Sequence, residues 1–171
     1  MKRLSVLAVA VSLLAAGCSK NTPTAPTATK PTFTATLSSQ NEVPAIAGAE
    51  AGGRGSATIV FNTTVAAGNI TAATADFTVN ITGLPAGTPI NLSHIHEAVS
   101  GVNGSVRVNL ALSAGEITVG PAGTVTFTKN GINVDPALAQ TIINNPAGYY
   151  FNSHSQQNPG GVVRGQLVRT Q

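Results

Sequence analysis

The feature that most constrains the fold of this chain is a series of short segments, from residue 33 onward, in which apolar and polar side chains alternate. Alternation with a period of two places the apolar side chains on one face of a β-strand, so each segment predicts a strand with one buried face. Clusters of glycine, proline and asparagine at 66–69, 84–87, 102–104 and 158–161 predict turns between them. The predicted strands cover residues 33–37, 56–61, 77–81, 90–96, 106–110, 125–128, 149–154 and 162–168.

Antiparallel strands with such short connections predict an all-β domain, either an eight-stranded β-sandwich or a flattened barrel. One segment interrupts the strand pattern at residues 136–144. It has Asp135 in the N-cap position and Pro136 at the first helical position, and it carries apolar side chains at 138, 142 and 143. We therefore expect one short helix, whose apolar face covers an open end of the sandwich.

The N-terminal residues have the pattern of a secretory leader. Lys2 and Arg3 precede an apolar run from residue 4 to residue 16. The run is shorter than the ~20 apolar residues that span a bilayer. Small residues precede Cys18 in an arrangement that resembles the lipobox of bacterial lipoproteins. We predict that residues 1–17 are a cleaved signal peptide and that Cys18 is lipidated. The alternative is a plain secretory peptide with a chance cysteine.

The next segment, residues 18–31, is rich in proline and threonine and has no large apolar side chain. Such a segment cannot bury enough apolar surface to fold, so it predicts a disordered tether. The tether would connect the membrane, through the lipid on Cys18, to a folded domain at residues 32–168. We therefore expect a lipid-anchored protein of the cell envelope. Ser19 after the cysteine favours the outer membrane where the host has two membranes.

The charge balance argues against nucleic-acid binding. The full chain has nine basic and six acidic residues, and loss of Lys2 and Arg3 with the leader leaves seven basic residues against the same six acids. A nearly neutral mature chain offers no basic stripe that could follow a phosphate backbone, so we expect no nucleic-acid partner. Cys18 is the sole cysteine. An intramolecular disulfide therefore cannot form, and the apolar core must stabilise the domain.

All three histidines of the chain lie in two short motifs, at 93–97 and at 150–154. In a strand, His94 and His96 point to the same face with their Cβ atoms about 7 Å apart. If the strand that ends at His154 lies alongside, three imidazole nitrogens would form a mononuclear site for zinc or copper. Alternatively, the histidines fix nearby loops by hydrogen bonds. The sequence leaves both interpretations open.

Glu42, Asn103 and Arg164 are further candidates for structural or binding residues, and an ion pair or a loop clamp is the expected role of Glu42 and Arg164. The serines show no G-x-S-x-G nucleophile motif. The six scattered acids offer no evident carboxylate pair for glycoside hydrolysis. We therefore expect that the chain is not an enzyme, and that zinc or copper is the only cofactor to consider.

Four motifs in this order resemble one known family: residues 37–44, the His94–His96 element with 101–104, residues 148–154, and residues 159–167. Together they resemble the CHRD domain, first described in chordin. The resemblance covers nearly the whole predicted domain and implies a β-sandwich found in secreted or surface proteins, without an established enzymatic activity.

The expected function is therefore a lipid-anchored, non-catalytic binding or interaction module of the cell envelope. Its partner would be a protein or matrix component that contacts the loops around His94, His96 and His154. The alternative is a mononuclear zinc or copper protein that uses the same three histidines as ligands.

Overall fold

The computed structural model describes residues 30–171. The predicted signal peptide, the lipidated Cys18 and nearly all of the predicted tether lie outside the described residues.

Within residues 30–171 the chain forms nine strands, one α-helix and three 3-10 turns. The strands are β1 (Thr32–Ser38), β2 (Arg54–Ala66), β3 (Asn69–Thr82), β4 (Pro89–Glu97), β5 (Ser105–Asn109), β6 (Ile117–Thr118), β7 (Thr124–Val134), β8 (Tyr149–Ser155) and β9 (Val163–Arg169). The helix is α1 (Pro136–Asn144), and the 3-10 turns are η1 (Ser39–Asn41), η2 (Gly48–Glu50) and η3 (Pro146–Gly148).

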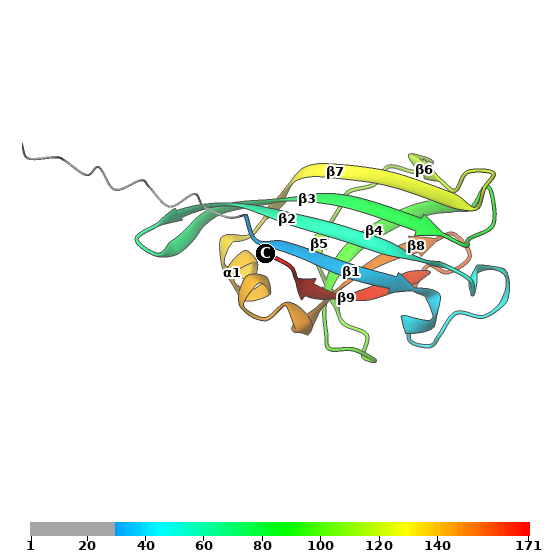
Figure 1. Ribbon diagram of the computed structural model, residues 1–171, viewed down its shortest axis with the longest axis horizontal. Coiled ribbons are helices and arrows are strands. Elements are labelled where there is room, and N and C mark those ends of the chain that lie inside the picture. The colour runs from blue at the N-terminus through cyan, green and yellow to red at the C-terminus, as the bar shows by residue number, and fades with distance from the viewer. Residues whose placement is uncertain (1–29) are drawn as a thin grey trace, which may run out of the picture.

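The strands form a single antiparallel sheet in the order β5-β4-β8-β9-β1-β2-β3-β7, with β6 paired to β4. The sheet curls on itself, so that β1, β2, β3 and β7 form one layer and β4, β5 and β8 lie behind it (Figure 1). The result is a nearly closed, flattened barrel. This confirms the predicted all-β class and all eight predicted strands.

The core lies between the two layers and follows the alternation of the sequence. In β1, for example, Phe33, Ala35 and Leu37 are buried while the residues between them are partly or fully exposed. Phe77 of β3 and Phe151 of β8 meet across the barrel with ring centroids 6.3 Å apart. Phe151 of β8 and the fully buried Ile95 of β4 point into the core. The residues next to them along these two strands must therefore point to the outer face.

Three strands, β2, β3 and β7, are much longer than the sequence pattern predicted. The β2–β3 hairpin continues beyond residues 61 and 77 to a tight turn at Ala67 and Gly68, whose φ angles are 50° and 82°. Such angles belong to a two-residue hairpin turn. Figure 1 shows the hairpin tip projecting past the body of the barrel. Its threonine and alanine side chains have no core to face, which is why alternation fades there. The two-residue strand β6 was also not predicted, since it is too short to show alternation.

Helix α1 is where the sequence predicted it. The Asp135 carboxylate accepts a hydrogen bond from the Leu138 backbone N–H at 3.0 Å and caps the first turn. Ala139, Ile142 and Ile143 are buried, and Leu138 packs partly buried beside them. The buried stripe is therefore one residue wider than predicted. It rests against β3 at one end of the barrel.

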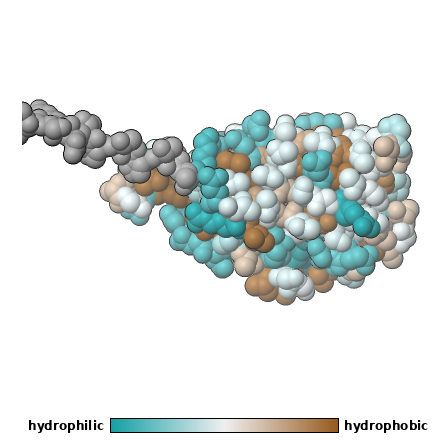
Figure 2. Space-filling model, in the orientation of Figure 1, coloured by the Kyte–Doolittle hydropathy of each residue, from teal (hydrophilic) through white to brown (hydrophobic). Residues whose placement is uncertain are grey.

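One face of the barrel is mainly polar. The face shown in Figure 2 mixes hydrophilic and neutral residues, with small apolar spots scattered among them. No helix in the described part of the chain combines the length and apolar character needed to cross a membrane.

Candidate functional site

The three histidines meet on the outer face of the β4–β8 pair. Leu92 of β4 lies opposite His154 of β8 in the antiparallel register. Ile95 is fully buried in the core, so its neighbours His94 and His96 point to the other face of β4. The structure therefore agrees with the shared face predicted for His94 and His96, and it places the two strands side by side, which the sequence left open.

Although they point outward, the imidazoles are buried. The exposed fractions are 6% for His94, 7% for His96 and 5% for His154. Two loops, 98–104 and 156–162, supply backbone contacts to the cluster. The histidines thus lie between a rigid sheet and the loops that cover it.

Two backbone carbonyls fix the tautomers of two histidines. His96 Nδ1 lies 3.0 Å from the Gly104 carbonyl oxygen, and His154 Nδ1 lies 2.9 Å from the Pro159 carbonyl oxygen. Because a carbonyl only accepts, each Nδ1 carries the proton and donates it. The Nε2 atom of each ring is then left with a lone pair. Metal-ligating histidines are commonly held in this way by their other ring nitrogen.

The third histidine faces one of these lone pairs. His94 Nδ1 lies 3.0 Å from His154 Nε2, so the ring of His94 donates to that of His154. One ligand nitrogen from each of the three rings lies within 4.8 Å of the others. His96 Nε2 is buried and has no hydrogen-bond partner. The cluster therefore presents converging nitrogens, one of which is unused.

The environment keeps the three rings neutral near pH 7. Burial, reinforced by the neighbouring His154, lowers the pKa of His94 from 6.5 to about 4. Burial also lowers the pKa of His96, against the opposing effect of its bond to Gly104, and lowers the pKa of His154, against its bond to Pro159. Neutral imidazole is the form that binds a metal ion.

Arg164 holds the loop beside the cluster. Its guanidinium donates to the carbonyl oxygens of Val99 at 3.1 Å and Val102 at 2.7 Å, and to Asn103 Oδ1 at 3.2 Å. Its Cζ atom lies 3.4 Å from the centre of the Tyr150 ring. Arg164 is thus a loop clamp, one of the two roles that its position in the sequence indicated.

The ring of Tyr150 connects this clamp to the histidines. It stacks on the His96 ring with centroids 4.8 Å apart and an interplanar angle of 7°. Its hydroxyl oxygen accepts a hydrogen bond from the Gly104 backbone N–H at 3.2 Å. Arg164, Tyr150 and His96 therefore form one stack, which orients the unused nitrogen of His96.

Asn103 connects two loops, as expected for a structural or binding residue. Its Nδ2 atom donates to the Val43 carbonyl oxygen at 2.7 Å, while its Oδ1 atom accepts from Arg164. Gln166, on the same face of β9 as Arg164, donates to the carbonyl oxygens of Ala98 and Ala147. The sequence analysis did not single out Gln166. Its parity with Arg164, two residues earlier in the same strand, was the available signal.

Glu42 does not form an ion pair. Within residues 30–171 the ion pairs are Arg107 with Glu97 and Lys129 with Glu116. Glu42 Oε2 instead accepts from Asn152 Nδ2 at 3.2 Å, and Glu42 Oε1 is buried without a partner.

Burial raises the pKa of Glu42 from 4.5 to about 7, although Arg164 and Asn152 oppose the shift. Asn152, which the sequence analysis did not single out, has an unpartnered buried Oδ1 atom. It shares its strand face with His154, and this parity was the signal that could have found it.

The substitution Glu42→Gln is expected to stabilise the domain at high pH only. Below pH 4.5 the carboxyl is protonated in both folded and unfolded chains. Between pH 4.5 and 7 the carboxyl ionises in the unfolded chain but stays protonated in the folded one, so the wild type loses stability over this range. Glutamine keeps an oxygen for Asn152. Urea unfolding should show a gain of about 1 to 3 kcal/mol at pH 8 that vanishes near pH 4.

The exposed Glu97→Gln is the control for this comparison, because its stability difference from the wild type should change little between the two pH values. Parallel curves for wild type and Glu42→Gln would contradict the assigned environment of Glu42.

A second buried acid, Glu50, fixes the loop after β8. Its Oε2 atom accepts from Ser155 Oγ at 2.6 Å and from Asn158 Nδ2 at 2.5 Å. The sequence analysis did not find this residue, because it lies about one hundred residues from both partners and outside any motif. Glu50 thereby contributes to the position of the Pro159 carbonyl, which orients His154.

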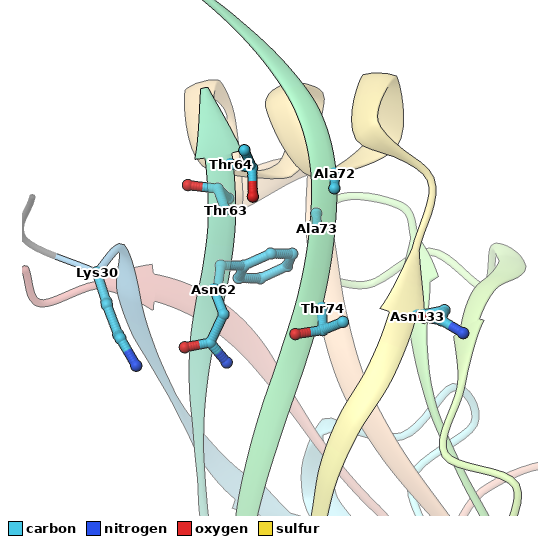
Figure 3. Close-up of a pocket in the computed structure, with 9 residues that line it drawn as sticks. Lys30, Asn62, Thr63, Thr64, Ala72, Ala73, Thr74 and Asn133 are labelled. Atoms are coloured by element: carbon cyan, nitrogen blue, oxygen red, sulfur yellow. The ribbon is translucent and has the colours of Figure 1, made fainter. Parts of the chain in front are cut away.

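A groove of the described surface lies away from these residues. It has a volume of about 500 Å³ and runs along the β2–β3 hairpin, as Figure 3 shows. Its lining is Lys30, Phe61, Asn62, Thr63, Thr64, Ala72, Ala73, Thr74 and Asn133. Apart from one lysine the lining carries no ionisable side chain. The chemistry of the domain is therefore concentrated at the histidine cluster and around Glu42.

The comparison with known families agrees with this geometry. Residues 33–167 match the family model described as the CHRD domain. A search of curated proteins found no match to the chain. The matched residues run from β1 to β9 and include the three histidines, Glu42 and Arg164. Because the match covers most of the chain, the protein belongs to the CHRD domain family.

Proposed function

We propose that this CHRD domain binds one transition-metal ion through His94, His96 and His154. The proposed role is binding rather than catalysis. The proposal includes export of the chain and anchoring in the cell envelope by a lipid on Cys18. The CHRD family itself suggests a binding or interaction module, and a metal ion is the ligand that the buried chemistry favours.

The observation that carries the proposal is the state of His96. Its Nδ1 atom donates to Gly104, while its Nε2 atom is buried, has a lone pair and meets no donor. Buried polar atoms in folded proteins are nearly always hydrogen-bonded. A histidine that only pinned a loop would not need its second nitrogen buried and unused among two other imidazoles. A metal ion would use that nitrogen.

The donor set favours zinc or copper. Imidazole nitrogen suits both ions. Around a tetrahedral ion with bonds of about 2.1 Å, the ligand nitrogens lie about 3.4 Å apart. The three nitrogens lie within 4.8 Å of one another, so side-chain movements of about 1 Å would close the site. Metal binding would also replace the His94–His154 hydrogen bond.

Metal analysis tests the proposal directly. The purified domain is stripped with a chelator, loaded with Zn²⁺ or Cu²⁺, dialysed and analysed for bound metal. We expect about one ion per chain for the wild type and none for the variant with all three histidines replaced by alanine. Leu92→Ala, an exposed change on the same strand, should retain the ion. Metal-free wild-type protein after loading would reject the proposal and favour the loop-pinning role of the histidines.

A partner protein or matrix component is a second candidate ligand, and one observation favours it. Val99 and Val102, on the loop that covers the cluster, are 60% and 50% exposed. Apolar side chains at a loop tip are suited to docking. Such a partner would bind over the same face of the domain.

A further inference from the structure

The segments 42–47 and 158–161 enclose a second cavity beside the histidine cluster. Its volume is about 280 Å³, at the small end of the range for ligand sites. It is lined by Glu42, the apolar run 43–47, Asn103, Asn158 and the backbone of 159–161. We propose that this cavity binds a primary alkylammonium group, with the Glu42 carboxylate as its counter-ion.

Buried acceptor atoms of Glu42 and Asn152 lack hydrogen-bond donors. Glu42 is only 7% exposed, yet its Oε1 atom has no hydrogen-bond partner, and neither has Oδ1 of the neighbouring Asn152. Gly161 also lines the cavity, and a Cβ atom built there would lie 2.6 Å from Glu42 Oε2. Glu42 and Gly161 both line the cavity, and only a glycine at position 161 leaves room for the Glu42 carboxyl group. A buried acceptor without a partner, on a residue that lines the cavity, calls for a ligand that donates.

The negative charge of Glu42 favours a cationic ligand. Glu42 is the single charged side chain among the described residues that line the cavity. The nearby Arg164 directs its guanidinium to Val99, Val102 and Asn103, so it forms no hydrogen bond with the carboxylate. A neutral donor would satisfy a hydrogen bond but would leave the buried charge uncompensated. A cationic donor supplies both, and the raised pKa of Glu42 agrees with a carboxylate whose burial outweighs the opposing charge of Arg164 in the free protein.

The oxygen atoms that the cavity offers favour an ammonium group over other cations. Calcium takes six to eight oxygen ligands and magnesium an octahedral set, whereas the side chains of this lining supply one carboxylate and two asparagine amides. A guanidinium binds best when both carboxylate oxygens are free, and Glu42 Oε2 already accepts from Asn152. One free oxygen matches a single ammonium N–H. The alkyl chain would lie along residues 43–47, which are apolar and mostly exposed.

The probes are n-butylammonium, for a free amine, and Nα-acetyl-lysine amide, for a lysine side chain of a protein. Each is titrated into metal-free protein at pH 8 and followed by amide chemical shifts. Saturable shifts at residues 42–47 and 158–161 are expected with at least one probe, and the tighter probe identifies the source. Butanol, which has the same chain without the charge, should bind at least tenfold more weakly.

Two further measurements make the test independent of the metal proposal. Glu42→Gln should weaken binding of the tighter probe at least tenfold, while His96→Phe should leave it unchanged. In the wild type, affinity should fall as pH is lowered from 8 to 6, because the cation must displace a proton from Glu42. Absence of binding by both probes, equal binding of butanol, or unchanged binding in Glu42→Gln overturns the inference. None of these results bears on metal loading.

Discussion

His96→Phe is expected to lower the affinity of the domain for zinc or copper by about 100-fold or more while the fold is retained. Loss of a hydrogen-bond partner of a ligand alone reduces metal affinity by about 10- to 100-fold, and loss of the ligand itself must exceed this. Phenylalanine keeps an aromatic ring stacked on Tyr150, so the packing around position 96 is preserved. The lost donor to Gly104 costs about 1 kcal/mol.

Competition against a chromophoric chelator measures this affinity, and thermal unfolding of the metal-free proteins measures the fold. Tyr150→Phe is the matched control, since it keeps the stack and all three imidazoles and should bind metal within about tenfold of the wild type. If His96→Phe bound metal as tightly as the wild type, His96 would not be a ligand. A large fall in melting temperature with no metal bound by either protein would instead assign the cluster to loop pinning.

Arg164→Met is expected to lower the free energy of unfolding by about 3 kcal/mol or more. The guanidinium is 1% exposed and donates to three acceptors in the 99–103 loop. Each hydrogen bond from a charged donor contributes about 1.5 to 3 kcal/mol, and a desolvated cation over an aromatic ring contributes up to about 2 kcal/mol. Part of this is recovered when water reaches the freed carbonyls. Methionine fills much of the same space but donates nothing.

Urea denaturation of the two proteins measures the difference. Arg107→Met is the matched control, because Arg107 is a strand arginine whose ion pair with Glu97 is about half exposed. Such surface pairs contribute about 0 to 1 kcal/mol. Arg164→Lys should recover little stability, since an ammonium cannot reproduce the planar set of donors. Equal stabilities of Arg164→Met and Arg107→Met would show that the clamp has no energetic role.

Much of the fold was predictable because it follows from local patterns. Alternation assigned Phe33, Ala35 and Leu37 to one buried face of their strand. The same period of two residues placed His94 and His96 together on one face of theirs. The proline after Asp135 marked the start of the one α-helix of the described chain. These features depend on residues close in sequence, whose spacing along a strand or helix is fixed by backbone geometry.

The candidate site was predictable only in part. The histidines were found because their residue type is rare in the chain and suited to metal ligation. Asn152, Gln166 and Glu50 are ordinary polar residues in sequence and gain their roles from partners many residues away. Glu42 was found, and of the two roles expected for it, an ion pair or a loop clamp, the ion pair does not form, because the loop brings Glu42 to the Asn152 amide and Arg164 is engaged elsewhere.

The sequence by itself determined where most strands lie, which face of each strand is apolar, and that His94 and His96 share one face of their strand. Only the tertiary structure decided that β4 and β8 are neighbours, that loop carbonyls bind two of the histidines, and that acceptors on Glu42 and Asn152 are buried without donors. The physical reason is the separation along the sequence of the residues that set each property. Side-chain parity is set by a repeat of two residues, whereas burial and hydrogen-bond partners are set by how the sheet closes and where long loops settle on it.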